Sequence, residues 1–221
     1  EKLEALRHFM ESLDYTFAKG QVIKPKIFNN LLKKVVGTAH ENVINTIVLR
    51  TQMQAKYSPE NQGHFGLSLT RYAHFTSPIR RYADVIVHRA LISALKLGND
   101  GLNQHDIEHM NETAEHISIT ERNSMVAERN STERYIAHYM SDKIDEEFQG
   151  RINGVLRAGL FISVEETGGE GFIPISSLYG DYFHHDKEHQ LLEGEHSGII
   201  YQLGDSVTVK LREANPVSGG L

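Results

Sequence analysis

Apolar residues recur every three or four positions near the start of the chain, and this spacing predicts amphipathic helices. The first pattern covers residues 2–17 and ends at Lys19-Gly20. A second helix should follow Pro25 and close at Gly37, and a third should cover residues 41–55. Their apolar positions are Leu3, Leu6, Phe9, Met10 and Leu13, then Ile27, Leu31, Leu32, Val35 and Val36, then Val43, Ile44, Ile47 and Val48.

Thr76-Ser77-Pro78 predicts another helix start, because serine is a good N-cap and proline suits the first helical position. This helix should run to about Leu97, before glycines break the pattern at residues 98–101. A long, strongly charged helical region is predicted from about residue 106 to residue 148, and it could kink near Asn130-Ser131.

From Phe148 onward the pattern changes to short β-rich runs separated by glycines. Such runs within about 70 residues predict a small barrel of the OB type. The predicted fold class is therefore α+β, with a mainly helical part at residues 1–145 and a small β-barrel at residues 146–221. The predicted strands are residues 150–156, 160–164, 171–175 and 206–211.

Composition and charge narrow the class of protein. No apolar run approaches the roughly 18 residues that span a bilayer, so we expect no membrane partner. The chain has no cysteine, which removes disulfides and thiolate catalysis and fits a cytoplasmic location. The net charge of −6 argues against nucleic acid, but residues 1–100 hold 14 Lys and Arg against 8 Asp and Glu. A basic region beside acidic scaffolding, or solvated faces that differ by chance, would both explain this asymmetry.

The predicted helix start at Ser77 carries the strongest candidate chemistry. Arg80 and Arg81 follow it directly, which would aim two cations and a helix N-terminus at a phosphate. Arg80, Asp84 and His88 are four residues apart and would share one helical face, so that Asp84 could orient Arg80. Arg81 could hold a second phosphate or a structural acid. A plain ion-pair network that stabilises the helix is the alternative.

Aromatic residues accompany the arginines in both parts of the chain. Aromatic rings beside arginines commonly stack bases and grip a nucleic-acid backbone, but some of these rings could instead be core. The candidates are Tyr72, His74, Phe75 and Tyr82 in the helical part, and Phe148, Phe161 and Phe172 with Arg157 and Arg212 in the barrel.

Acidic residues give weaker signals. Glu121 and Glu128 are seven apart in the long helix and could help position a nucleotide, although a solvated, salt-bridged helix is the alternative. Residues 179–189 are rich in His and acids, but they are expected to form a loop and show no supported metal-ligand spacing. The chain has no dense Asp cluster of the kind that a two-metal nuclease needs. The residues alone therefore support nucleic-acid binding better than hydrolysis.

At these residues the chain resembles a known family. The segment GHFGLSLTRYAHFTSPIRRYADVIVHRAL (Gly63 to Leu91) is similar to the signature of the RNB family of exoribonucleases, which includes ribonuclease II and ribonuclease R. LRTQMQAKYSPENQGHFGL before it and ITERNSMVAERN after it resemble the same family. The glycine-rich part, with DYFHHDKEH and YQLGD, resembles the S1-type RNA-binding domain of these enzymes. Its spacing and acidic character are most like those of bacterial ribonuclease R.

The resemblance implies a processive, Mg²⁺-dependent 3′-to-5′ exoribonuclease that acts on single-stranded RNA and releases nucleoside 5′-monophosphates. It implies that Arg80 contacts the region of the scissile phosphate, and that Glu128 lies near the active site. Residues of the same signature would line that site or shape its wall: Tyr72, His74, Phe75, Thr76, Ser77 and Arg81. In the barrel, Arg157, Phe161 and Phe172 are the candidates for RNA contact.

The chain departs from the family in one respect. The family's metal-binding aspartates belong to an N-terminal motif that is not in these 221 residues, so no metal ligand is assigned here. We expect a fragment that lacks the N-terminal half of the parent enzyme and that is inactive alone. The alternative is a catalytically inactive RNA-binding or regulatory module.

Overall fold

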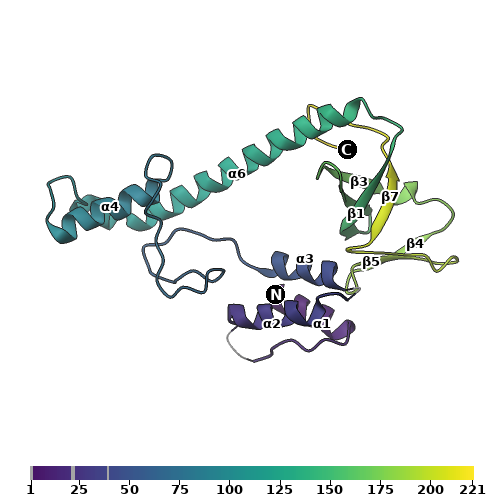
Figure 1. Cartoon of the computed structure of the whole chain (residues 1–221), viewed down its shortest axis with the longest axis horizontal. Coiled ribbons are helices and arrows are strands. Elements are labelled where there is room, and N and C mark those ends of the chain that lie inside the picture. Colours follow the sequence, from purple (N-terminus) through teal and green to yellow (C-terminus); the bar gives the residue numbers. More distant parts are fainter. Residues whose placement is uncertain (1, 21–22, 39) are drawn as a thin grey trace. The chain divides into compact units, whose positions relative to one another are not determined.

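The computed structural model describes residues 2–20, 23–38 and 40–221, and these form two compact units (Figure 1). One unit combines Glu1–Gln52 with Glu128–Leu221, and the other is Met53–Ala127. The predicted α+β class, with helices followed by a small antiparallel barrel, is confirmed. The division into residues 1–145 and 146–221 is a sequence-based assignment of domains and stays a prediction.

The first unit begins with three short helices, α1 (Lys2–Ser12), α2 (Pro25–Val35) and α3 (Glu41–Thr51). Helix α1 ends earlier than predicted because Asp14 takes a positive φ of 60° and Tyr15 N–H turns back to the Met10 carbonyl. Their buried faces use apolar positions that the sequence pattern indicated: Leu6, Phe9, Met10, Leu31, Val35, Val43, Ile44 and Val48.

The second unit contains α4 (Tyr82–Leu95), α5 (Gln104–Glu108) and the first part of α6 (Met110–Ser141). The predicted start of α4 at Pro78 is wrong, because Arg81 is extended (φ −124°, ψ 111°) and the helix begins after it. The predicted helix over residues 106–148 is interrupted at His109, which ends α5. Helix α6 then runs without a break through residues 130–131 and ends at Ser141.

Two antiparallel sheets form the β-rich part. The four-stranded sheet has the order β3-β2-β1-β7, from β1 (Glu147–Leu156), β2 (Gly159–Val164), β3 (Glu170–Pro174) and β7 (Ser206–Lys210). The other sheet has the order β4-β5-β6, from β4 (Phe183–Asp186), β5 (Leu191–Gly194) and β6 (Ile200–Gln202). A single turn of 3-10 helix, η1 (Ile175–Ser177), follows β3.

The loop predicted over residues 179–189 is wrong for residues 183–186, which form β4 and pair with β5 in a hairpin, whereas the residues on either side are turns. Alternate residues of this hairpin point into the barrel core, where Phe183 and Leu192 are buried. Polar residues between them hid the alternation in the sequence.

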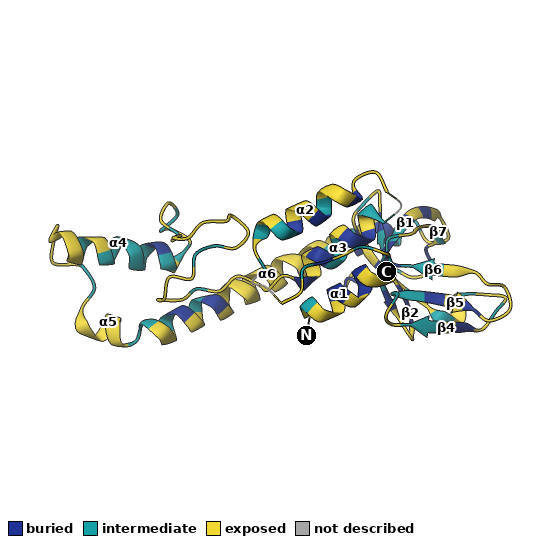
Figure 2. Ribbon diagram, turned by 90° about the horizontal axis from the view of Figure 1, so that it is seen from below, coloured by how far each residue is buried: buried dark blue, intermediate teal, exposed yellow. Residues whose placement is uncertain are grey.

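Burial differs strongly along the chain (Figure 2). The barrel core is closely packed and almost wholly apolar, as expected for inward-facing positions of a small barrel. Its buried members are Phe148, Ile152, Val155, Leu160, Ile162, Val164, Phe183, Leu192, Leu203 and Leu211. Among the residues that the structure describes, no helix is long and apolar enough to cross a membrane.

Candidate nucleic-acid interface

A buried carboxylate organises the segment before α4. Asp84 is fully buried, and its Oδ2 accepts hydrogen bonds from the Ser77 N–H at 2.7 Å and from Arg81 Nη2 at 2.9 Å. Arg81 Nε lies 2.9 Å from the other carboxylate oxygen. Burial alone would raise the pKa of Asp84, but these hydrogen bonds and the Arg81 charge outweigh it and hold the pKa below its ordinary value. Asp84 therefore fixes the turn that carries Arg80.

The predicted pairing of Arg80 with Asp84 is wrong, because both arginines precede the helix and the four-residue spacing does not apply there. Asp84 pairs instead with Arg81, which thus has the structural acid that the sequence offered as one option. Arg80 is exposed, and among the described residues its guanidinium has no hydrogen-bond or ion-pair partner. The structure therefore presents Arg80 as a free cation on an ordered turn.

Aromatic and imidazole rings lie in contact beside this turn. The Phe75 and His88 rings have centroids 4.4 Å apart, and His88 Nε2 lies 2.7 Å from the Phe75 carbonyl oxygen. Tyr72 meets His74 edge-on at 5.7 Å. Tyr72 and Phe75 remain 42% and 47% exposed, so both keep surface available for stacking. Thr76 is an exposed residue of the same segment, whereas Ser77 is half-buried.

Tyr57 belongs to this cluster, and the sequence did not single it out. Its hydroxyl lies 3.0 Å from His74 Nδ1, and its N–H donates to Ser118 Oγ at 2.9 Å. Partial burial, and then the negative charge of Glu121, raise the pKa of Tyr57. Tyr57 and Ser118 are 61 residues apart, so no local pattern could have joined them.

Glu128 is an exposed residue on the continuous helix α6, and it opens the second segment of the unit that also contains Glu1–Gln52. Its carbonyl accepts a hydrogen bond from Thr132 Oγ1, and the next residue, Arg129, pairs with Glu133 at 3.3 Å. These local contacts suit a solvated helix, and a role for Glu128 stays a prediction.

In the barrel, the structure joins two of the predicted RNA-binding rings. Phe161 and Phe172 are directly paired across β2 and β3, with centroids 5.0 Å apart and exposures of 41% and 37%. Arg157 lies exposed in the turn between β1 and β2. By contrast, Phe148 is buried, and Arg212 pairs with Asp145 at 3.0 Å.

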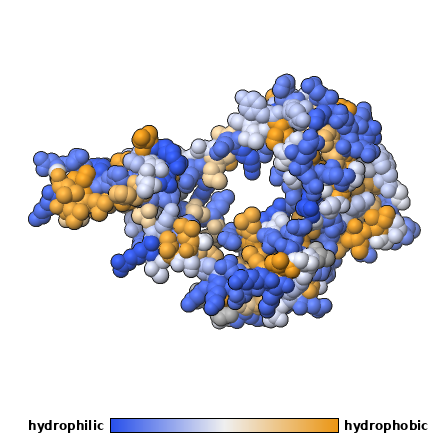
Figure 3. Space-filling view, viewed as in Figure 1, coloured by the Kyte–Doolittle hydropathy of each residue, from blue (hydrophilic) through white to orange (hydrophobic). Residues whose placement is uncertain are grey.

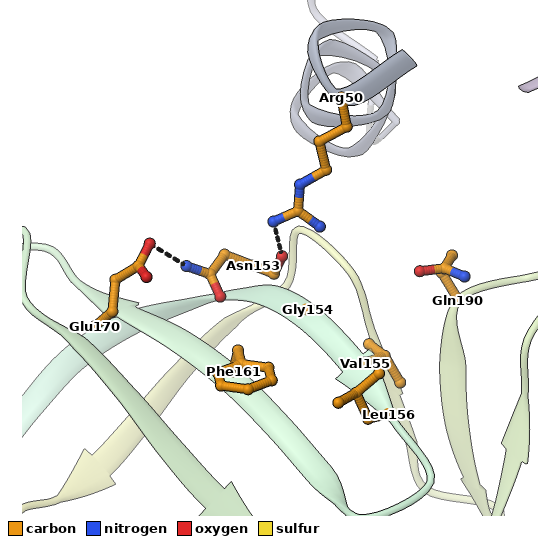
Figure 4. Close-up of a pocket in the computed structure, with 8 residues that line it drawn as sticks. All are labelled: Arg50, Asn153, Gly154, Val155, Leu156, Phe161, Glu170 and Gln190. Atoms are coloured by element: carbon orange, nitrogen blue, oxygen red, sulfur yellow. Dashed lines mark hydrogen bonds between the residues drawn. The ribbon is translucent and has the colours of Figure 1, made fainter. Parts of the chain in front are cut away.

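Next to Phe161 lies a cavity of about 250 Å³ that the sequence did not indicate (Figure 4). It is bounded by Arg50 at the end of α3, by the middle of β1, and by Glu170 and Gln190. The Arg50 guanidinium donates to the Asn153 carbonyl across a separation of 103 residues. Only the fold brings these residues together.

The described residues include no group of three or more His, Cys, Asp or Glu side chains that could hold a metal ion. The His-rich residues 184–189 form ordinary pairs instead, such as His189 Nδ1 with Asp186 at 2.6 Å.

Comparison with known proteins identifies two domains in this chain. Residues 1–97 match the RNB domain, and residues 141–219 match the S1 RNA binding domain. The chain is 40% identical over 210 residues to ribonuclease R of Aquifex aeolicus, covering 95% of this chain and 30% of that protein. It is 34% identical to ribonuclease R of Escherichia coli, covering 97% of this chain and 27% of that protein.

The chain is also similar to a solved structure, Mycoplasma genitalium RNase R in complex with ribose methylated single-stranded RNA. The match covers 99% of this chain and 35% of that protein's chain. The TM-score is 0.86 at 26% identity. The chain thus carries part of an RNB domain and an S1 RNA binding domain. The resemblance to the RNB family is confirmed, and this chain spans less than a third of the length of the two ribonucleases R named above.

Proposed function

We propose that this chain is part of a 3′-to-5′ exoribonuclease of the ribonuclease R type, which hydrolyses single-stranded RNA to nucleoside 5′-monophosphates. The observation that carries the proposal is the exposed Arg80, held on a turn that Asp84 and Arg81 lock in place. A cation fixed before the substrate arrives can stabilise negative charge that develops on a phosphate during hydrolysis.

The surrounding groups have separate roles in this proposal. Tyr72, His74, Phe75 and Thr76 line the RNA path beside Arg80, while Arg81 and Ser77 hold the turn. In the barrel, Phe161 and Phe172 stack bases of the incoming single strand, and Arg157 contributes a charge near its path. Glu128 lies near the reacting phosphate in the whole enzyme.

Magnesium would supply an activated water and charge neutralisation to such a nuclease. Because the described residues offer no fitting ligand set, we propose that the ligands belong to other parts of the longer protein. We also propose a cytoplasmic location for that protein, a class of location that the cysteine-free sequence of these 221 residues fits.

The test is RNA hydrolysis by the longer protein that contains this chain, with wild type compared with Arg80→Ala. Loss of one charge-stabilising donor should lower turnover by roughly 10²-fold or more, with little change in RNA affinity. Lys56→Ala is the matched control, since it removes one exposed charge from the same unit.

Near-normal turnover of Arg80→Ala would mean that hydrolysis does not depend on Arg80. If the longer wild-type protein binds single-stranded RNA but releases no monophosphates, the exonuclease proposal fails and the non-hydrolytic RNA-binding module takes its place.

A further inference from the structure

The cavity beside Phe161 is built by an irregularity in β1. The pairing of β1 with β2 shifts register between Ile152 and Gly154, which is the signature of a β-bulge. Asn153 occupies the bulge, and its carbonyl oxygen accepts the hydrogen bond from Arg50. Its side-chain Nδ2 donates to Glu170 Oε1 at 3.2 Å. One residue therefore holds a cation on one side and a carboxylate on the other (Figure 4).

Most hydrogen-bond donors of the Arg50 guanidinium remain free in this arrangement. A guanidinium has five N–H donors in a planar fork, and the Asn153 carbonyl uses one of them. Among the described residues it has no acidic partner, and Arg50 is exposed. Such a positioned, unpaired guanidinium suits an oxyanion such as a phosphate.

Phe161 gives the cavity an open aromatic face. The residue paired with it on β1 is Gly154, where a Cβ atom would lie 3.2 Å from the Phe161 Cβ and 3.3 Å from its ring. Glycine therefore allows the ring to lie close to β1. The ring is 41% exposed and lines the same cavity as Arg50.

We propose that Arg50 and Phe161 together hold one nucleotide of single-stranded RNA, with the phosphate on Arg50 and the base stacked on Phe161. The cavity volume of about 250 Å³ suits a single nucleotide unit rather than a longer stretch. Glu170 repels phosphate from the far side of Asn153, so the site favours one placement of the backbone. This inference rests on the proposed function and adds to it a residue of α3, outside the barrel.

The test is binding of a fluorescent oligouridine to the 221-residue chain at several salt concentrations. Arg50→Ala should weaken binding by about 5- to 10-fold at low salt and reduce the salt slope by about 0.7, the value for one phosphate contact on a single strand. Arg50→Lys should keep the slope, because it keeps the charge. Arg50→Gln should behave like Arg50→Ala, because it keeps an amide donor for Asn153 but loses the charge.

Lys34→Ala is the matched control, since Lys34 is an exposed cation of α2 that does not line the cavity. Phe161→Ala should weaken binding by about 5-fold or more, and its effect should not add to that of Arg50→Ala if both touch one nucleotide. Melting curves of all variants establish that they are folded.

The outcomes separate this inference from the proposed function. If Phe161→Ala weakens binding while Arg50→Ala and Arg50→Gln match Lys34→Ala, the barrel binds RNA and the role of Arg50 is overturned. If Arg50→Lys loses the salt slope as Arg50→Ala does, Arg50 acts through its contact with Asn153, and the phosphate site is also overturned. If the wild-type chain binds no RNA, the RNA-binding proposal falls as a whole.

Discussion

The β-barrel and the unit Met53–Ala127 are stabilised by different kinds of contact. The barrel buries a dense set of large apolar side chains, with Ile152, Leu160 and Leu192 each at most 1% exposed. Within residues 53–127, all of which the structure describes, the buried residues are Asp84, Ala114 and Ser118. Apolar burial supplies most of the stability of a folded domain, so the second unit depends much more on directed polar contacts.

The exposed surface of the second unit shows the same contrast. Ile79, Leu91, Leu95 and Leu97 are all at least 40% exposed, and Figure 3 shows hydrophobic colour on the surface around α4. The two candidate RNA surfaces are therefore held in place by different kinds of structure. Phe161 and Phe172 stand on a rigid sheet, whereas Arg80 depends on one carboxylate.

The largest expected effect concerns the barrel core. Leu160→Ala should lower the free energy of unfolding of the barrel by about 2–5 kcal/mol, because it removes apolar contacts and leaves a cavity. Urea unfolding followed by hydrogen exchange of the β1 and β2 amides measures this loss. Leu156→Ala is the control, since Leu156 is 48% exposed in the same sheet and should cost at most about 0.5 kcal/mol. Equal losses would show that the barrel does not depend on its apolar core.

A smaller and local effect is expected in the second unit. Asp84→Asn removes the charge that holds Arg81 and the Ser77 N–H, so exchange of amides near residue 77 should accelerate roughly tenfold or more. Barrel amides should not change. Asp100→Asn, at an exposed position of the same unit, is the control. Unchanged exchange at Ser77 would mean that the turn is held by something other than Asp84.

The smallest expected effect is the pH dependence of the structure around two carboxylates, Asp181 and Asp84, because it is absent near neutral pH and appears only in acid. Asp181 in the barrel region accepts hydrogen bonds from the Ser197 hydroxyl and N–H at 2.6 Å, and these lower its pKa strongly. Asp84 also has a lowered pKa, because the Ser77 N–H and Arg81 outweigh the effect of its burial. Both folded-state pKa values lie below the ordinary value of about 3.9, so both contributions are complete above that pH and fade as pH falls toward the folded-state pKa.

Residues 195–198 and residues 77–81 should therefore both keep their structure from neutral pH down to about pH 3.9, and lose it only below that value. Chemical shifts of the Ser197 and Ser77 amides, followed from pH 6 downward, measure the two transitions. A transition of either amide well above that pH would contradict the expected link between these carboxylates and the local structure.

Sequence reasoning was most successful where one local rule dominates. Apolar spacing located α2, α3 and four of the strands, because those positions face a core. It misplaced the start of α4, because the side chain of Asp84, seven residues ahead, holds the Ser77 N–H and lets Arg81 stay extended. That contact is set by tertiary structure rather than by capping preference.

The two candidate sites also differ in whether local sequence or tertiary contacts define them. The motif around Arg80 is contiguous, so the sequence could name its members, although it assigned Asp84 to the wrong arginine. The Arg50 cavity unites α3, β1 and β3, and no spacing in the sequence relates Arg50 to Asn153.

Residues 215–221 lie at the edge of the four-stranded sheet, where they affect how copies of the protein can associate. Strand β3 is the last in the order of its sheet, and unpaired edge strands are templates for aggregation. Here the Phe172 N–H donates to the Leu221 carbonyl at 3.1 Å, and Asn215 pairs with Gly220 in the same tail. The tail thus occupies part of the edge that another chain could otherwise extend. Its hydrogen bonds protect the folded protein from edge-to-edge association between copies.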